Sequence, residues 1–292
     1  MTWRTVCVTE PAKLELKLGY LVVRGEAVAR VSLSEIGMLI VESTQVAITS
    51  ALLCELSKRK IKVIFCDQQH NPYAELVDYY GSADSLRRLR EQLTWSKELC
   101  QKLWREIVKE KISQQAALLK EKGHFEENNM LLEYRSKVVE NDATNREAHA
   151  AKVYFNCLFG NEFSRKDDSV ENAALNYGYS LLLSCFNKEI VSRGYLTQLG
   201  LHHQNTFNQF NFSSDLMEPF RPLVDRWVLV NKFDQFNKEE KHIMLGILNS
   251  IVELGGTKQN LTQAINLYCS SVFRALNHAD PLLIEFYQCV DS

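Results

Sequence analysis

The chain has 292 residues, a formal net charge of −2, 46% hydrophobic residues and 24% charged residues. These proportions are those of a globular protein and exclude a chain that is disordered throughout. The nearly balanced charge excludes a protein that coats nucleic acid by bulk attraction, so any nucleic-acid contact must come from a local basic face. The length favours two domains of ordinary size, each able to bury a core.

The eight cysteines contain no C-x-x-C pair, and most of them lie among apolar neighbours. This usage is typical of reduced, buried thiols in a cytosolic protein rather than of a disulfide framework or a zinc ribbon. The start of the chain, MTWRTVCVTE, has no secretory signal pattern, and no apolar run approaches the length of a membrane span. We therefore expect a soluble cytosolic protein without a membrane partner.

Residues 1–80 have the pattern of a β-rich domain. Short segments enriched in Val and Leu predict strands over 3–9, 13–17, 20–24, 27–31, 38–42, 63–66 and 73–76. Leu18-Gly19 and Gly25-Glu26 are two-residue connections that suit tight hairpins, and residues 50–60 predict a helix. No glycine-rich phosphate loop follows a strand, so a dinucleotide-binding unit is excluded and a dimerisation or partner surface is expected.

The composition changes near Gly81, and helical periodicity dominates from residue 84 to residue 292. A long helix capped by Asp84 or Ser85 is predicted to run to Gly123. Further helices are predicted over 129–139, 144–159, 170–193, 222–230, 238–254 and 261–276. The expected fold class is α+β: a small N-terminal β-sheet domain with one helix, followed by a larger all-helical domain. Five basic residues of the long helix are predicted to form a solvated face: Arg87, Arg88, Arg90, Lys109 and Lys111.

The stretch from residue 200 to 225 gathers two histidines, His202 and His203, and two acids, Asp215 and Glu218. The acids are three residues apart, so they project from one face if a helix begins near Ser214. A histidine with carboxylates from separate segments can hold a divalent metal, and such oxygen-rich sites favour Mg²⁺ or Mn²⁺ over zinc. Such a site still needs a third ligand from elsewhere in the chain.

Two prolines, Pro219 and Pro222, bound the acidic segment and each removes a backbone donor. We expect a kinked or restarted helix there, with Glu218 at a helix end.

The segment TNREAHAAKVYF begins with Thr144-x-x-Glu147, which fits a capping box. Polar residues nevertheless crowd its first turn, just before a face of small residues. Polar groups on a buried helix need partners, and a metal with a phosphate would supply them. The next helical segment interleaves Asn and Tyr with apolar residues and carries Gly178, which indicates close approach of another helix.

Four motifs in register resemble the CRISPR-associated integrase family, the catalytic subunit of spacer acquisition, in its type II form. They are Glu147-x-x-Ala150-Ala151-Lys152-x-Tyr154-Phe155, Asn172-Ala173-x-Leu175-Asn176-Tyr177-Gly178-Tyr179, Gly200-Leu201-His202-His203 and Asp215-Leu216-Met217-Glu218-Pro219-Phe220-Arg221-Pro222. The resemblance covers the whole chain. It implies that Glu147, His203 and Glu218 are the metal ligands and that Asp215 is an accessory acid, with His202 beside the site or in the core.

The chain departs from the family pattern at three positions. Many members carry Asp where Glu218 stands, Gly where Ala148 stands and Arg where Lys152 stands. Glu keeps a ligand with a longer reach, whereas Lys keeps the charge and loses the bidentate fork of Arg.

The resemblance implies a metal-dependent DNA integrase or endonuclease of CRISPR adaptation. It would use Mg²⁺ or Mn²⁺ to join the 3′-hydroxyl of a short DNA fragment to the CRISPR repeat boundary by transesterification. The implied partners are double-stranded DNA (prespacer and repeat), a second copy of the chain, a small CRISPR-associated subunit, other type II adaptation proteins and the RNA-guided effector nuclease. The residues expected to contact DNA are Arg146, Lys152, Arg165 and Arg221.

Two alternatives remain open at this point. One is a non-catalytic scaffold of the same fold that bridges DNA. The other is a helical di-iron carboxylate protein, which Glu121-x-x-His124 and Glu239-x-x-His242 suggest.

Overall fold

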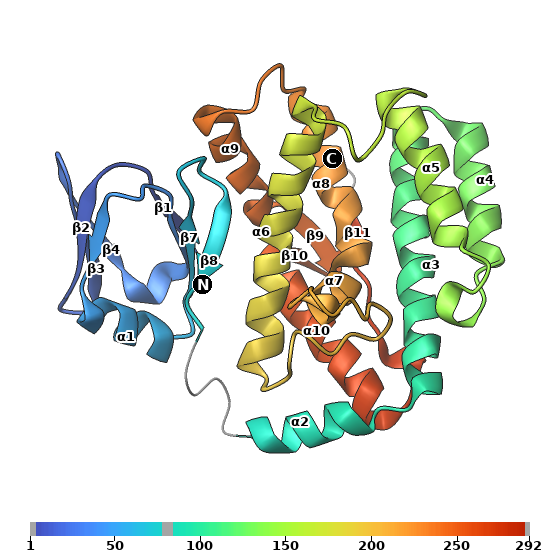
Figure 1. Ribbon diagram of the computed structural model, residues 1–292, viewed down its shortest axis with the longest axis horizontal. Coiled ribbons are helices and arrows are strands. Elements are labelled where there is room, and N and C mark those ends of the chain that lie inside the picture. The colour runs from blue at the N-terminus through green and yellow to red at the C-terminus, as the bar shows by residue number, and fades with distance from the viewer. Residues whose placement is uncertain (1–3, 78–83, 290–292) are drawn as a thin grey trace. The chain divides into compact units, whose positions relative to one another are not determined.

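The computed structural model describes residues 4–77 and 84–289, and the chain divides into two compact units, Met1–Ala83 and Asp84–Ser292 (Figure 1). Trp3, at the start of the first predicted strand, and Gly81, where the composition changes, lie outside the described residues. Within the described residues, no helix is long and apolar enough to cross a membrane.

The strands of the first unit form two four-stranded sheets in the described part, with orders β1-β5-β7-β8 and β4-β3-β2-β6. The strands are β1 (Arg4–Val8), β2 (Ala12–Lys17), β3 (Tyr20–Arg24), β4 (Val28–Ser32), β5 (Ile36–Val41), β6 (Val46–Ile48), β7 (Lys62–Cys66) and β8 (Pro72–Glu75). The predicted strands are confirmed to within two residues, but β6 was missed. β6 has only three residues and owes its extended form to parallel pairing with β2.

Both sheets and helix α1 (Ser50–Lys58) share one hydrophobic core. Leu52 and Leu56 of α1, together with Leu14 and Leu21 of the β2–β3 hairpin, are fully buried. Burying each such side chain contributes roughly 1.5–3 kcal/mol. The hairpin turn at Leu18-Gly19 has positive φ at both residues, 50° and 81°, as the predicted tight turn requires.

The second unit starts with two helices, α2 (Ser85–Thr94) and α3 (Lys97–Glu121), where one long helix was predicted. That prediction was wrong at residues 95–96. Trp95 leaves the helical conformation to pack its ring on Tyr195 and Phe212, at centroid distances of 5.5 and 5.6 Å. The Ser96 hydroxyl then caps α3 by accepting a hydrogen bond from the backbone N–H of Leu99. The predicted stop at Gly123 is confirmed by its φ of +87°.

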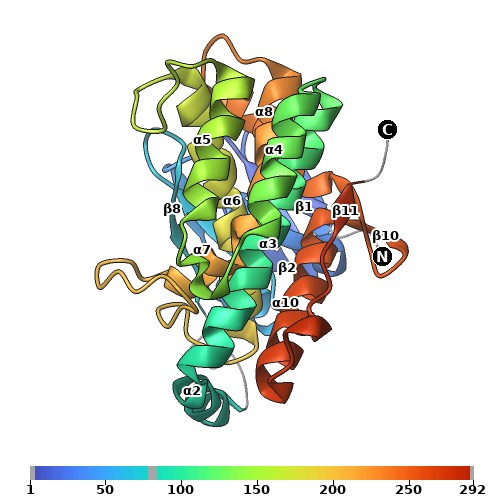
Figure 2. The same cartoon turned by 90° about the vertical axis from the view of Figure 1, so that its right-hand side faces the viewer.

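Helix α3 is the centre of the second unit, with α4 and α5 lying side by side against it (Figure 2). It also packs against α7, α8 and the short 3₁₀ segment η3. The remaining helical elements are α4 (Phe125–Ser136), η2 (Glu140–Asp142), α5 (Arg146–Phe159), α6 (Val170–Ser192), α7 (Asn211–Met217), η3 (Glu218–Phe220), α8 (Arg221–Asn231), α9 (Lys238–Leu245), η4 (Gly246–Asn249), α10 (Leu261–His278) and η5 (Pro281–Leu283).

A small antiparallel sheet accompanies these helices, with strand order β10-β9-β11. The strands are β9 (Ile251–Leu254), β10 (Thr257–Asn260) and β11 (Gln288–Cys289). The helix predicted over 238–254 therefore ends at Leu245. Gly255 and Gly256 both adopt positive φ and turn β9 back into β10, which a continued helix would not allow. The α+β class is confirmed, with this sheet added to the helical unit.

Gly178 lies where α6 approaches α8 and α9. A Cβ atom at this position would stand 2.4 Å from Cγ1 of Val224 and 2.7 Å from Cε of Met244. The glycine is therefore required by close packing, as its position in the middle of a helix predicted.

Gly178→Ala is expected to lower the free energy of unfolding by about 1–2 kcal/mol, because overpacking outweighs the gain of roughly 1 kcal/mol in helix propensity. Urea unfolding of the full chain, followed by tryptophan fluorescence, measures the difference. Lys188→Ala, on the same helix but at a partly exposed position, is the control and should change stability by less than about 0.5 kcal/mol. A Gly178→Ala variant as stable as the parent would contradict the close approach.

Candidate active site

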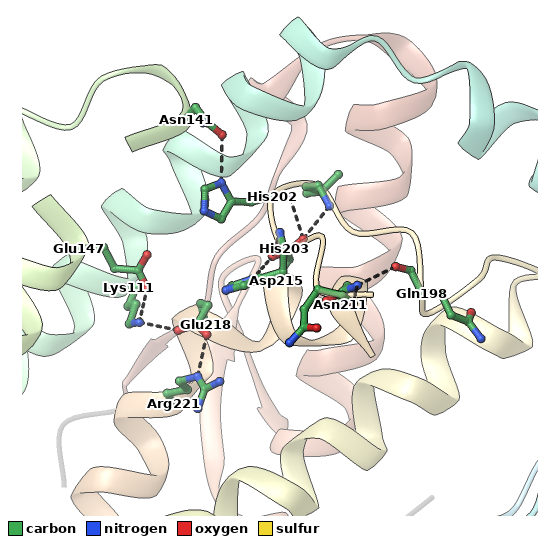
Figure 3. A network of polar contacts seen from close by, with 12 residues as sticks. Lys111, Asn141, Glu147, Gln198, His202, His203, Asn211, Asp215, Glu218 and Arg221 are labelled. Carbon is green, nitrogen blue, oxygen red and sulfur yellow. Dashed lines mark hydrogen bonds and ion pairs between the residues drawn. The ribbon is translucent and has the colours of Figure 1, made fainter. Parts of the chain in front are cut away.

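The ammonium group of Lys111 joins the two carboxylates that the sequence singled out. Lys111 extends from α3, Glu147 from the first turn of α5, and Glu218 from η3 (Figure 3). Lys111 Nζ lies 2.5 Å from Oε1 of Glu147 and 2.5 Å from Oε2 of Glu218. Because both carboxylate oxygens contact the same nitrogen at 2.5 Å, they lie no more than twice that distance apart, although they come from segments far apart in the chain.

Glu218 is held at a junction between helices. Helix α7 ends at Met217, Glu218 begins the 3₁₀ segment, and α8 restarts at Arg221, as the two prolines predicted. The Tyr287 hydroxyl, which is buried, donates a hydrogen bond to the Pro219 carbonyl oxygen at 3.0 Å. A residue distant in the chain, Tyr287, thus holds the junction in place. Glu218 at this junction is only 4% exposed.

Glu147 is directed toward Lys111 because another residue caps its helix. The Asp142 carboxylate accepts hydrogen bonds from the backbone N–H groups of Arg146 and Glu147, each at 2.9 Å. The predicted Thr144–Glu147 capping box was therefore wrong. Asn145 adopts a left-handed conformation with φ of 53° just before the helix, and Asp142 supplies the cap from three residues further back. The Glu147 side chain is left free to meet the ammonium.

Asp215 organises the loop that carries both histidines. One of its carboxylate oxygens accepts the backbone N–H groups of Leu201 and His202, at 2.6 and 2.9 Å. The other lies 3.2 Å from the backbone nitrogen and 2.5 Å from Nδ1 of His203. Gly200 is required beside them, because a Cβ there would lie 2.6 Å from the same carboxylate. Asp215 is completely buried, and these contacts replace the hydrogen bonds to water that its carboxylate loses on burial.

The two histidines have different surroundings. His203 turns Nδ1 to Asp215, which leaves Nε2 as its remaining ligating atom. The His202 ring stacks on Trp104, with ring centroids 4.4 Å apart and planes within 3°, and its Nδ1 lies 3.0 Å from the Asn141 side-chain oxygen. Sequence reasoning missed Trp104 and Asn141, since neither lies near the histidines in the chain.

The charges of the cluster shift the pKa values of its groups. The hydrogen bond to Asp215 raises the pKa of His203 above its ordinary value, against the effect of partial burial. Burial opposes ionisation of Glu218, but Arg221 and Lys111 hold its pKa at about 2. Burial would also lower the pKa of Lys111, yet Glu147 and Glu218 raise it above its ordinary value. At neutral pH, an ammonium and an ionised carboxylate therefore face each other inside the protein.

A buried carboxylate and two tyrosines lie next to the cluster. Asp225 accepts hydrogen bonds from the hydroxyls of Tyr154 at 2.8 Å and Tyr179 at 2.5 Å. Burial raises the pKa of Asp225 to about 6, against these hydrogen bonds. Arg221 lies over the Tyr179 ring and donates through Nε to Oε1 of Glu218 at 2.8 Å. Tyr179 thus positions Arg221. Sequence reasoning did not single out Asp225.

The four basic residues expected to contact DNA have unequal environments. Arg221 belongs to the buried cluster, and Arg165 is hydrogen-bonded to Asn172 and Asn176. Arg146 lies over the Tyr134 ring, with Cζ of its guanidinium group 5.9 Å from the ring centroid. Lys152 is exposed, and its place five residues after Glu147 puts it on a different face of α5.

Lys111 was predicted to lie on a solvated face, and that prediction was wrong. Its side chain is only 11% exposed. Leu103 and Ile107 precede it at four-residue spacing and are fully buried, so the same spacing carries Lys111 into the apolar stripe of α3. This periodicity was the signal available in the sequence.

The donor set suits a divalent cation. Two carboxylates from different elements contact one ammonium, which is itself a cation. The His203 imidazole belongs to the same polar network (Figure 3). Oε2 of Glu218 is buried and accepts no hydrogen bond of normal geometry, despite its closeness to Lys111. An oxygen left in this state is suited to metal coordination. Among the described residues, the ligating atoms of Glu147, His203 and Glu218 do not all lie within 4.8 Å of one another, and Lys111 stands between the two carboxylates.

The di-iron alternative finds no matching arrangement. Glu121 ion-pairs with Arg226 at 2.8 Å. Within residues 4–77 and 84–289, no compact ligand group unites Glu121 and His124 with Glu239 and His242.

A pocket of about 580 Å³ adjoins His203 on the side of α2. Its lining is rich in amide side chains: Gln92, Gln198, Gln204, Asn205, Asn208, Gln209 and Asn211. Asn211 donates to the carbonyl oxygens of Gln198 and Asn205 and so orders the loop that forms the wall.

Comparison with known proteins identifies the family of this chain. A family model described as CRISPR associated protein Cas1 matches residues 6–247. The CRISPR-associated endonuclease Cas1 of Neisseria meningitidis serogroup C (strain 8013) is 36% identical over 230 residues, which cover 78% of this chain and 76% of the relative. The chain therefore belongs to the Cas1 family of CRISPR-associated proteins.

Solved structures share the fold at low sequence identity. A casposase bound to its integration product matches with a TM-score of 0.79 and 18% identity, covering 100% of this chain and 96% of that one. A Cas6-RT-Cas1–Cas2 complex matches with a TM-score of 0.76 and 16% identity, covering 99% of this chain and 36% of that one.

Asp215→Asn is expected to return the pKa of His203 to near the ordinary value of about 6.5, because the negative partner of Nδ1 is lost. The raised pKa means that the His203–Asp215 ion pair stabilises the folded state below about pH 6.5 and loses this effect as pH rises through the raised value. NMR titration of the histidine signals measures the pKa of His203 in the parent protein and in Asp215→Asn. His203→Gln assigns the signal, and His278, outside the cluster, supplies the reference signal. An unchanged His203 titration in Asp215→Asn would contradict the assigned contact.

Proposed function

We propose that the protein is a metal-dependent DNA integrase and endonuclease of CRISPR adaptation. The observation that carries this proposal is that the Glu147 and Glu218 carboxylates meet around one buried cation position, with His203 in the same polar network (Figure 3). The names of the relatives, a Cas1 endonuclease and a casposase bound to an integration product, support the same chemistry.

The reaction is a transesterification. The 3′-hydroxyl oxygen of a short DNA fragment forms a bond to a phosphorus atom at the CRISPR repeat boundary, and the bond from that phosphorus to its leaving oxygen breaks. The hydroxyl proton is lost, and the leaving oxygen becomes a new 3′-hydroxyl. Mg²⁺ or Mn²⁺ at the site would stabilise charge on the transferring phosphoryl group and position the attacking hydroxyl.

The residues of the chain have separate roles in this proposal. Glu147, Glu218 and Nε2 of His203 would hold the divalent ion. Asp215 orients the imidazole through Nδ1, and Arg221 keeps Glu218 ionised from the opposite side. His202 fixes the loop against Trp104. No protein nucleophile takes part, which agrees with the absence of a Ser/His/Asp or Cys/His arrangement from the sequence motifs.

We further propose the partners. Double-stranded DNA, as prespacer and repeat, is the substrate, with Arg146, Lys152 and Arg165 among its contacts. The Cas1–Cas2 complex among the structural neighbours supports a small Cas2-type subunit as partner. A second copy of the chain pairs through the β-rich unit, and type II adaptation proteins with the RNA-guided effector nuclease complete the assembly.

Glu147→Gln and Glu218→Gln are each expected to lower integration of a labelled prespacer into a repeat-containing plasmid by at least about a hundredfold. Each loses a ligand to an ion that supplies several kcal/mol of transition-state stabilisation. His203→Ala should behave likewise, EDTA should abolish the reaction, and Mg²⁺ or Mn²⁺ should restore it.

Glu126→Gln, at an exposed position of α4, is the matched control and should retain full activity. Circular dichroism verifies that each variant is folded. Full integration by Glu147→Gln would instead support the alternative of a non-catalytic DNA-bridging scaffold.

A further inference from the structure

Lys111 is the buried group of the site to which the proposed reaction assigns no role. Its side chain is 11% exposed and emerges from the apolar stripe of α3, next to the fully buried Trp104 and Ile107. Placing an ammonium there costs several kcal/mol of hydration, and only close anionic partners offset that cost. Glu147 and Glu218 are those partners, each with an oxygen 2.5 Å from Nζ.

The two cations that bind Glu218 use different oxygens. Arg221 Nε lies 2.8 Å from Oε1, whereas Lys111 Nζ lies 2.5 Å from Oε2. A divalent ion that ligates Oε2 of Glu218 and Oε1 of Glu147 can therefore leave the Arg221 contact intact. It cannot leave the Lys111 contact intact, because Mg²⁺–oxygen bonds of about 2.0–2.1 Å would place the ion and the ammonium in the same space.

We propose that Lys111 is a competitor for the metal: its ammonium occupies the cation position between Glu147 and Glu218, and binding of the divalent ion requires the ammonium to leave. This inference rests on the proposed metal-dependent function. It assigns to Lys111 two linked effects. The ammonium keeps the two carboxylates together before the metal arrives, and it weakens metal binding, because the ion must replace an existing ion pair.

The test is direct measurement of Mn²⁺ binding to the full chain without DNA, by electron paramagnetic resonance of free Mn²⁺ and by calorimetry. Lys111→Met keeps the length of the side chain and removes the competing charge. It is expected to bind Mn²⁺ at least tenfold more tightly than the parent protein. Its Tm without metal should be lower, because two carboxylates lose their partner, and the rise in Tm on adding Mn²⁺ should be larger than in the parent.

Three further variants keep the experiment decisive. Lys111→Gln removes the charge but keeps a hydrogen-bond donor for the carboxylates, so it should also bind Mn²⁺ more tightly if Lys111→Met folds poorly. Lys111→Arg keeps a competing cation and should not bind more tightly than the parent. Lys109→Met is the control on the same helix, because Lys109 pairs with Glu106 outside the site, and its Mn²⁺ affinity should not change.

Equal or weaker Mn²⁺ binding by both Lys111→Met and Lys111→Gln would overturn the competitor role. The metal site itself would stand in that case, provided that the parent protein binds Mn²⁺ and the Glu218→Gln variant does not. If neither the parent protein nor any variant binds Mn²⁺, and if integration proceeds in EDTA, the proposed function and the competitor role of Lys111 are both overturned.

Discussion

The burial of the Glu218 carboxylate is the constraint on which the rest of the helical unit depends. An ionised carboxylate that is 4% exposed requires positive partners on each side, and Arg221 and Lys111 provide them. Removing either partner from such an arrangement typically costs about 3–5 kcal/mol, since a buried charge is left uncompensated. The positions of α3, η3 and α8 are therefore coupled through one side chain, in addition to their apolar packing.

The histidine loop follows a similar rule with backbone groups in place of side chains. Asp215 is completely buried, and three successive backbone nitrogens together with one imidazole surround its carboxylate. A loop that surrounds a charge in this way has few alternative conformations, so His203 is held in place before any ligand binds. Preorganisation of this kind is what electrostatic catalysis requires, because the protein does not need to rearrange during the reaction.

The sequence was most informative where local rules decide the structure. The Leu18-Gly19 turn, the Gly123 helix stop and the restarted helix at Pro219 and Pro222 each depend on φ angles or missing donors that a few residues determine. The close approach at Gly178 was predicted for a different reason, since a glycine in the middle of a helix lowers helix stability and indicates that a side chain would not fit. The motif resemblance identified the acids and the histidines that the fold gathers.

Sequence reasoning failed where distant partners override local preference. Thr144–Glu147 has the spacing of a capping box, but Lys111 attracts the Glu147 carboxylate and Asp142 takes over the cap. Lys111 was assigned to solvent from its charge, although its spacing from Leu103 and Ile107 indicated burial. The helix break at Trp95 depends on Tyr195 and Phe212, which are a hundred or more residues away in the chain, and no local pattern reports such contacts.

The hydrogen bond from Tyr287 to Pro219 has a consequence for the order in which the protein is built. Tyr287 follows every residue of the site in the chain, and Gln114 of α3 donates to its backbone carbonyl oxygen at 3.0 Å. During synthesis, Glu147, His203 and Glu218 all leave the ribosome before the tyrosine that secures the helix junction at Glu218. A nascent chain can therefore fold its β-rich unit early, while the candidate active site is completed only when nearly all of the helical unit has been made.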